Sequence, residues 1–256
     1  MAELNKLQPL SNLTKDKLKK IKLIIFDVDG VIVKRGTILK QFGKNTRFKI
    51  KKIGKKEIKQ IKQITKLGFN VNINSGRGLY LLEEMFREIM PYVSITYENG
   101  SATWFKGKVY QHINSFTKLR KVMEKLSKIK NPNIKGFEPK EFIITIHCKK
   151  RVKKIEETID KENDLYYIWN NEAYDIGIKK DQTKSNGIKK LAKLLKLNKE
   201  NILVIGDNYN DKEMLSEGGI SVTADKSRVS GNYYIKLNNK NLPAYQLMKH
   251  IISIMK

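Results

Sequence analysis

The sequence predicts an α/β protein in which a central parallel sheet carries a smaller α+β unit. Apolar runs alternate along the chain with amphipathic helical patterns, an order typical of parallel strands joined by right-handed crossovers. Two of these runs, at 21–26 and 201–205, end in acidic loops. A chain of 256 residues with 40% hydrophobic content is long enough for a sheet core plus an inserted unit.

The core elements alternate in type over the first hundred residues. Isoleucines recur on one face of a helix that Gly68 ends, and a second helix stops before Pro91. After residue 180, Thr183 caps a further amphipathic helix that precedes the strand at 201–205. The predicted elements of the first part are a strand at 21–26, a helix at 55–67, a strand at 69–73, a helix at 79–89 and a strand at 93–97.

The middle of the chain predicts a separate small sheet backed by two helices. Its expected elements are a hairpin around Lys106 and Gly107, a helix at 116–129, a strand at 141–147, a helix at 152–160, and strands at 165–169 and 173–178. The short groups of polar and charged residues that could form a site lie before residue 80 and after residue 180. We therefore predict a core of residues 1–102 and 180–256, with an inserted cap at 103–179.

Two pairs of carboxylates follow the apolar runs. Asp27 and Asp29 come after the strand at 21–26, and Asp207 and Asp211 come after the strand at 201–205. Because ligands gather at the carboxyl ends of parallel strands, we expect these groups to share one site. Clustered carboxylates repel one another unless a cation or proton intervenes, and an all-oxygen ligand set suits Mg²⁺. The sequence thus predicts a magnesium site.

Four short motifs stand in a fixed order along the chain: Asp27-Val28-Asp29-Gly30, Asn74-Ser75-Gly76-Arg77, Lys184 at the start of a helix, and Gly206-Asp207 to Asp211. They resemble the four motifs of the haloacid dehalogenase superfamily of phosphohydrolases. The resemblance rests on the order and spacing of the four motifs, which lie toward both ends of the chain. The second motif more often reads Thr-Gly-Arg, and Ser75 keeps the hydroxyl.

The resemblance implies a Rossmann-like core with helices on both faces and a role for each motif residue. Asp27 would be the nucleophile and Asp29 the general acid/base. Ser75, Gly76 and Lys184 would bind the phosphoryl group. The metal site would comprise Asp27, Asp207, Asp211 and the backbone carbonyl of Asp29. A cap between the second and third motifs resembles the C2-type cap of subclass IIB, which includes sugar-phosphate, phosphoglycolate and trehalose-phosphate phosphatases.

Several of these residues also have simpler interpretations. The Ser75 hydroxyl could serve only as a helix cap. Lys184 lies in a chain with 52 lysines and arginines, although its place in the first turn of a helix calls for a compensating anion. Arg77 either contacts substrate or pairs with a surface acid such as Glu83 or Glu84. Asn208 either shapes a turn or contacts the metal loop.

The predicted function is a Mg²⁺-dependent phosphatase that hydrolyses a small phosphorylated metabolite, a sugar phosphate or phosphoglycolate, through an aspartyl-phosphate. A phosphomutase of the same superfamily would use the same carboxylates. A basic nucleic-acid-binding protein with a degenerate phosphatase core is the alternative from another class. The motifs do not choose among substrates, and the oligomeric state is not indicated.

The formal net charge of +26 favours anionic partners. Because the lysines are scattered and lack interleaved aromatic residues, we interpret them as solvated surface rather than a nucleic-acid site. The sequence shows neither a membrane span nor a secretion signal, so we expect no membrane partner and a cytoplasmic location. Cys148 is the single cysteine, which excludes an intramolecular disulfide and a cysteine metal site.

Overall fold

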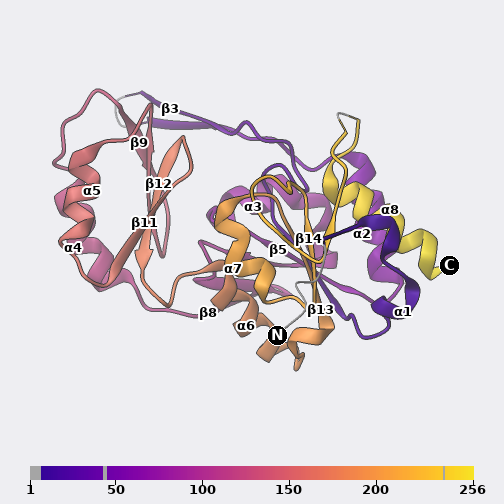
Figure 1. Ribbon diagram of the computed structural model, residues 1–256. Coiled ribbons are helices and arrows are strands. Elements are labelled where there is room, and N and C mark those ends of the chain that lie inside the picture. The colour runs from indigo at the N-terminus through magenta and orange to yellow at the C-terminus, as the bar shows by residue number, and fades with distance from the viewer. Residues whose placement is uncertain (1–6, 43–44, 239) are drawn as a thin grey trace.

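The computed structural model describes residues 7–42, 45–238 and 240–256 (Figure 1). Residues 1–6, which the predicted division assigns to the core, lie outside the described residues. Within the described ranges the main sheet has nine strands, and all neighbours pair in parallel except at the β6-β7-β8 edge. In spatial order they are β1 (Gln8–Pro9), β15 (Tyr233–Tyr234), β14 (Ile220–Thr223), β13 (Ile202–Gly206), β2 (Leu23–Phe26), β5 (Asn70–Asn74), β6 (Val93–Tyr97), β7 (Ala102–Phe105) and β8 (Lys108–Gln111).

Helices cover both faces of this sheet. Ile24 and Phe26 of β2 share a core with α2 (Lys55–Lys66), α3 (Leu79–Phe86) and α8 (Pro243–Met255). Leu23 and Ile25 face α6 (Lys184–Leu194) and α7 (Lys212–Ser216). The predicted α/β class is confirmed. The short helices are α1 (Lys15–Leu18), η1 (Leu10–Asn12), η2 (Arg87–Tyr92), η3 (Lys199–Asn201) and η4 (Tyr209–Asp211).

The helix expected at 79–89 differs in detail from the observed one. Its α-helical part ends at Phe86, and the chain continues as the 3₁₀ helix η2, which contains Pro91. Because proline has no N–H, it cannot continue the α-helical hydrogen-bond pattern, and the α-helix therefore ends before Pro91. None of the helices in the described ranges combines the length and apolar character needed to cross a lipid bilayer.

A smaller antiparallel sheet with two helices lies at the left in Figure 1. Its strands run β11 (Leu165–Trp169), β12 (Ala173–Ile178), β10 (Ile144–Cys148) and β9 (Ile134–Glu138), and α4 (Phe116–Leu126) and α5 (Lys153–Asp160) cover one face. Ile146 and Tyr174 pack against Leu119 and Ile155 in this second core. The α+β cap is thus present, and β9 is a strand that the sequence pattern did not predict.

The hairpin expected around Lys106 and Gly107 is formed by β7 and β8, but these strands extend the main sheet rather than the cap sheet. The predicted boundary at residue 103 therefore cuts through the main sheet. We propose that the core extends to Gln111 and that the cap begins after it.

A second hairpin, formed by β3 (Ile38–Phe42) and β4 (Asn45–Lys49), reaches from the core toward the cap (Figure 1). Its strand β3 runs beside β9 of the cap sheet. Phe48 of β4 makes an edge-to-face contact with Tyr80 at the start of α3. The sequence analysis assigned no element to this part of the chain. The β3-β4 hairpin gives the cap a contact with the core in addition to the two segments of chain that connect them.

Candidate active site

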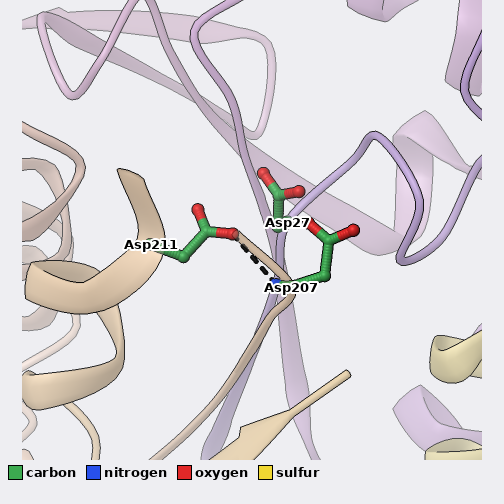
Figure 2. A group of neighbouring side chains, drawn as sticks. All are labelled: Asp27, Asp207 and Asp211. Carbon is green, nitrogen blue, oxygen red and sulfur yellow. Dashed lines mark hydrogen bonds between the residues drawn. The ribbon is translucent and has the colours of Figure 1, made fainter. Parts of the chain in front are cut away.

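The register of β2 and β13 brings the two acidic loops together. Ile205 lies opposite Phe26, and the Asp27 N–H donates to the Ile205 carbonyl at 3.0 Å. Asp27 and Asp207 therefore follow neighbouring strands at the same edge of the sheet (Figure 2). One carboxylate oxygen from each of Asp27, Asp207 and Asp211 falls within a group whose members lie within 4.8 Å of one another.

The loop after β2 is closed by backbone hydrogen bonds and depends on Gly30. Gly30 has φ +91°, and a Cβ there would lie 2.5 Å from Oδ2 of Asp207 and 2.8 Å from Nε of Arg35. Both the left-handed backbone and the close approach of these side chains require glycine. Arg35 donates from Nη2 to Oδ2 of Asp207 at 2.6 Å. The sequence analysis did not identify Arg35.

Asp211 is held by the turn that it closes. Its Oδ2 accepts from the backbone N–H groups of Asp207 at 3.0 Å and Asn208 at 3.2 Å. The Asn208 side chain accepts from the N–H of Tyr209 at 2.9 Å. Asn208 therefore shapes the turn, one of its two expected interpretations, and its side-chain hydrogen bond is directed to the backbone.

Lys184, at the start of α6, contacts the carboxylates of Asp27 and Asp211. The Thr183 hydroxyl caps α6 by accepting from the Asn186 N–H at 3.1 Å, which places Lys184 in the first helical turn. Its ammonium donates to Oδ1 of Asp27 at 2.6 Å and to Oδ1 of Asp211 at 2.7 Å. This pair of carboxylates supplies the anionic compensation that the helix N-terminus requires for a lysine.

When all three carboxylates are ionised, the cluster carries more negative than positive charge. Burial and the neighbouring Asp211 carboxylate raise the pKa of Asp27 to about 8, although Lys184 opposes them. Burial alone would lower the pKa of Lys184, but the carboxylates of Asp211 and Asp27 outweigh it and raise that pKa. The pKa of Asp207 is raised by burial despite the Arg35 guanidinium. An additional cation would relieve this excess of negative charge.

The donor set fits a hard divalent cation. Within the described residues, Oδ1 of Asp207 is buried and has no hydrogen-bond partner. Such an atom is costly unless a ligand satisfies it. With the nearby oxygens of Asp27 and Asp211 it forms the all-oxygen set that Mg²⁺ prefers. Asp29 does not belong to this side-chain group.

The raised pKa predicts how the stability of the metal-free protein depends on pH. Between about pH 4 and pH 8, folded Asp27 retains a proton that the unfolded chain releases. The contribution of Asp27 to the free energy of unfolding is therefore fully present below about pH 4, and it is lost as the pH rises through about 8. Urea unfolding in EDTA should show that the free energy of unfolding falls as the pH rises, and the Asp27→Asn variant should show a smaller fall. Equal pH dependence in both proteins would contradict the assignment.

The Ser75-Gly76-Arg77 motif follows β5, the strand beside β2. Ser75 is buried, and its hydroxyl accepts from the Arg77 N–H at 3.2 Å. Gly78 rather than Ser75 is the N-cap of α3. The Arg77 guanidinium holds both oxygens of Asp29 at 2.8 Å. Arg77 thus pairs with an acid of the first motif, and not with Glu83 or Glu84 as one interpretation expected.

Glu98 joins the cap to this edge of the core, a role that the sequence did not indicate. It lies in the left-handed region at φ 48°, after β6. Its carboxylate accepts from three successive backbone N–H groups, Glu141 at 3.0 Å, Phe142 at 2.6 Å and Ile143 at 3.1 Å. These bonds explain why β10 begins at Ile144, three residues later than predicted.

Comparisons with known proteins agree with this arrangement. Residues 112–232 match the family model of haloacid dehalogenase-like hydrolases, a range that contains Lys184, Asp207 and Asp211. No curated protein matches the sequence. The remaining similarities are to solved structures, and their identities are low enough that they show a shared fold only.

Three of these structures illustrate the likeness. A phosphatase of the haloalkanoate superfamily from Bacteroides thetaiotaomicron is 17% identical, with a TM-score of 0.66 over 91% of this chain and 96% of that chain. A subclass IIB sugar phosphatase is 18% identical, with a TM-score of 0.62 over 90% and 98%. A haloacid dehalogenase-like hydrolase from B. subtilis is 17% identical, with a TM-score of 0.64 over 90% and 100%.

The shared fold covers both the sheet core and the cap, and the family match covers the third and fourth motifs. The chain therefore shares the fold of these solved structures, and its residues 112–232 are similar to the haloacid dehalogenase-like hydrolases.

Proposed function

We propose that the protein is a Mg²⁺-dependent phosphatase that hydrolyses a small phosphorylated metabolite through a covalent phosphate on Asp27. The observation that carries this proposal is the meeting of Asp27 with Asp207, Asp211 and Lys184 at one buried edge of the sheet. When bound by the three carboxylates, Mg²⁺ would neutralise part of the negative charge of the phosphoryl group. The subclass IIB sugar phosphatase among the structural relatives supports the same reaction class.

In the first half of the reaction, an Asp27 carboxylate oxygen attacks phosphorus and forms an aspartyl-phosphate. The bond to the leaving oxygen breaks, and that oxygen takes a proton from Asp29. Lys184, released from its contact with Asp27, would bind a phosphoryl oxygen, and the Ser75 hydroxyl would donate to another. Arg77 orients Asp29 through its two-point hydrogen bond.

In the second half, a water oxygen attacks phosphorus and passes a proton to Asp29. The bond between phosphorus and Asp27 breaks, inorganic phosphate forms, and Asp29 is again protonated. Arg77 would hold the Asp29 carboxyl group in position to accept this proton. Division into two displacements replaces one difficult step by two easier ones.

Release of inorganic phosphate from a panel of phosphate esters tests the proposal directly. We expect turnover with Mg²⁺ and none after treatment with EDTA. A phosphomutase would instead return the phosphoryl group to a sugar, so isomerised sugar phosphate without free phosphate would contradict hydrolysis. Absence of turnover with every ester, p-nitrophenyl phosphate included, would contradict the enzyme assignment.

Replacement of Asp29 by asparagine should slow both halves of the reaction. The amide neither donates a proton to a leaving alcohol nor accepts one from water, so we expect kcat to fall by about 10²–10⁴-fold. Because its carbonyl can still accept a hydrogen bond from Arg77, the fold should persist. Steady-state kinetics with a poor leaving group such as an alkyl phosphate would measure the loss, and a normal rate would remove Asp29 from the scheme.

A further inference from the structure

The loop of the second motif is held at three successive backbone carbonyls. The outer two, those of Ser75 and Arg77, accept from backbone N–H groups of the turn at 98–99, each at 3.2 Å. The Gly76 carbonyl between them accepts from the Lys140 ammonium at 2.6 Å. Lys140 lies in the cap, in the loop between β9 and β10. The cap therefore supplies the hydrogen bond at the middle carbonyl.

The Lys140 side chain is buried, and its shortest polar contact is with this carbonyl. It is 2% exposed, and its ammonium lies 3.5 Å from Oε1 of Glu138 and 3.7 Å from Oδ1 of Asp175. Both acids have shorter hydrogen bonds to other side chains of the cap, at 2.8 Å and 2.5 Å. Burial acts to lower the pKa of Lys140, but the two carboxylates outweigh it and raise that pKa. The Gly76 carbonyl therefore accepts from a charged donor.

The chain beside Lys140 is bonded to the core. The Glu98 carboxylate accepts from the backbone N–H groups of residues 141–143. Gln182, which is buried just before α6, donates from Nε2 to the Phe142 carbonyl at 2.6 Å. These bonds confine the backbone from which the Lys140 side chain reaches the second motif, so its ammonium has a defined place there.

Acceptor oxygens crowd the second motif at Gly76. A Cβ on Gly76 would lie 2.8 Å from Oδ1 of Asn99 and 3.2 Å from Oδ2 of Asp175. The Lys140 ammonium lies within 4 Å of both the Gly76 carbonyl and the Asp175 carboxylate, and it thereby offsets the repulsion between their oxygens. Without it, rotation of the peptide that follows Gly76 would relieve that repulsion.

The peptide between Gly76 and Arg77 links Lys140 to Ser75. Its carbonyl accepts from Lys140, and its N–H donates to the Ser75 hydroxyl oxygen at 3.2 Å. Because the carbonyl and N–H of one peptide lie in one plane, a bond at one end restricts the direction of the other. A charged donor at the carbonyl also polarises the peptide and strengthens donation by its N–H. Since Ser75 accepts this bond, its own proton is left to donate elsewhere.

We propose that Lys140 is a positioning residue: through the peptide between Gly76 and Arg77, it orients the Ser75 hydroxyl toward the phosphoryl group. The inference rests on the proposed phosphatase function and on the role of Ser75 in it. Because the phosphoryl group is common to all substrates, Lys140 acts on every ester alike and does not select the leaving group.

A double-mutant cycle between Lys140→Met and Ser75→Ala tests this coupling. Ser75→Ala removes a donor to the phosphoryl group and should lower kcat/KM by about 10²-fold. Lys140→Met leaves the hydroxyl in place but removes its support, so we expect a loss of about tenfold. The double variant should lose about 10²-fold, as Ser75→Ala does, whereas independent effects would multiply to about 10³-fold. Each loss should be alike for p-nitrophenyl phosphate and an alkyl phosphate.

The matched control is Lys135→Met, the same change at an exposed position on β9, which should keep the wild-type kcat/KM. If Lys140→Met does not fold, as judged by circular dichroism, the cycle is repeated in Glu138→Gln, which removes an acid that would otherwise lose its buried cation.

Losses that multiply, a loss confined to one of the two esters, or wild-type kcat/KM in folded Lys140→Met would overturn the inference. Wild-type kcat/KM in Ser75→Ala would also overturn it, while leaving the phosphatase assignment intact. Absence of turnover by the unmodified protein with every ester would instead contradict the proposed function.

Discussion

Asp27→Asn should abolish hydrolysis, with kcat reduced by about 10⁴-fold or more, because an amide oxygen is a poor nucleophile toward phosphorus. The fold should remain, since the asparagine carbonyl can still accept from the Lys184 ammonium, as Oδ1 of Asp27 does at 2.6 Å. Above about pH 8, where Asp27 of the folded metal-free protein is ionised, loss of this buried negative charge should leave the variant at least as stable as the wild type. Phosphate release and urea unfolding measure the two effects.

The control for this variant is Asp16→Asn, an identical change at a side chain that is 81% exposed and pairs with Lys19. It should leave both kcat and the free energy of unfolding unchanged within error. Appreciable turnover by Asp27→Asn that scales with enzyme concentration would rule out Asp27 as the nucleophile.

Lys184→Met should affect both stability and catalysis. Without the ammonium, Asp27 and Asp211 are left as neighbouring buried acids, and removal of one partner of a buried ion pair costs about 3–5 kcal/mol. We therefore expect a large loss of stability in EDTA and a larger stabilisation by Mg²⁺ than in the wild type. Loss of a cation at the phosphoryl group should lower kcat by about 10²–10³-fold.

Lys189→Met is the matched control, because Lys189 lies on the same helix with its side chain 59% exposed. Urea unfolding of both variants, each with EDTA and with saturating Mg²⁺, separates the loss of a buried charge from a general effect on α6. If Lys184→Met were no less stable than Lys189→Met in EDTA, the carboxylates would not depend on Lys184.

The sequence predicted those parts of the fold that follow from local pattern. β2 is apolar on both faces, and Asp27 and Asp29 follow it, so both the strand and a candidate site could be predicted without knowledge of its neighbours. The same holds for β13 and for α6, where Thr183 caps the helix that presents Lys184. The convergence of these elements followed from the parallel order of the strands.

Other features depend on contacts between segments far apart in the chain, and their residues carry no local signal. Arg35 and Glu98 are single charged residues in loops, and only their partners, Asp207 and the amides of 141–143, reveal what they do. β7 and β8 form the expected hairpin, but the sheet that they join is set by pairing with β6. The alignment of Glu138, Thr145 and Asp175 across the cap sheet likewise depends on the register of three strands.

The most direct test of the account is identification of the residue that carries phosphate during turnover. Asp29→Asn should be mixed with substrate and Mg²⁺ and quenched in acid within the first turnover, and the protein should then be digested and examined by mass spectrometry. The account predicts one added phosphoryl group on the peptide that contains Asp27, and its absence when Asp27→Asn is combined with Asp29→Asn. A phosphoryl group on a different residue, or rapid phosphate release with no modified peptide at any time, would contradict it.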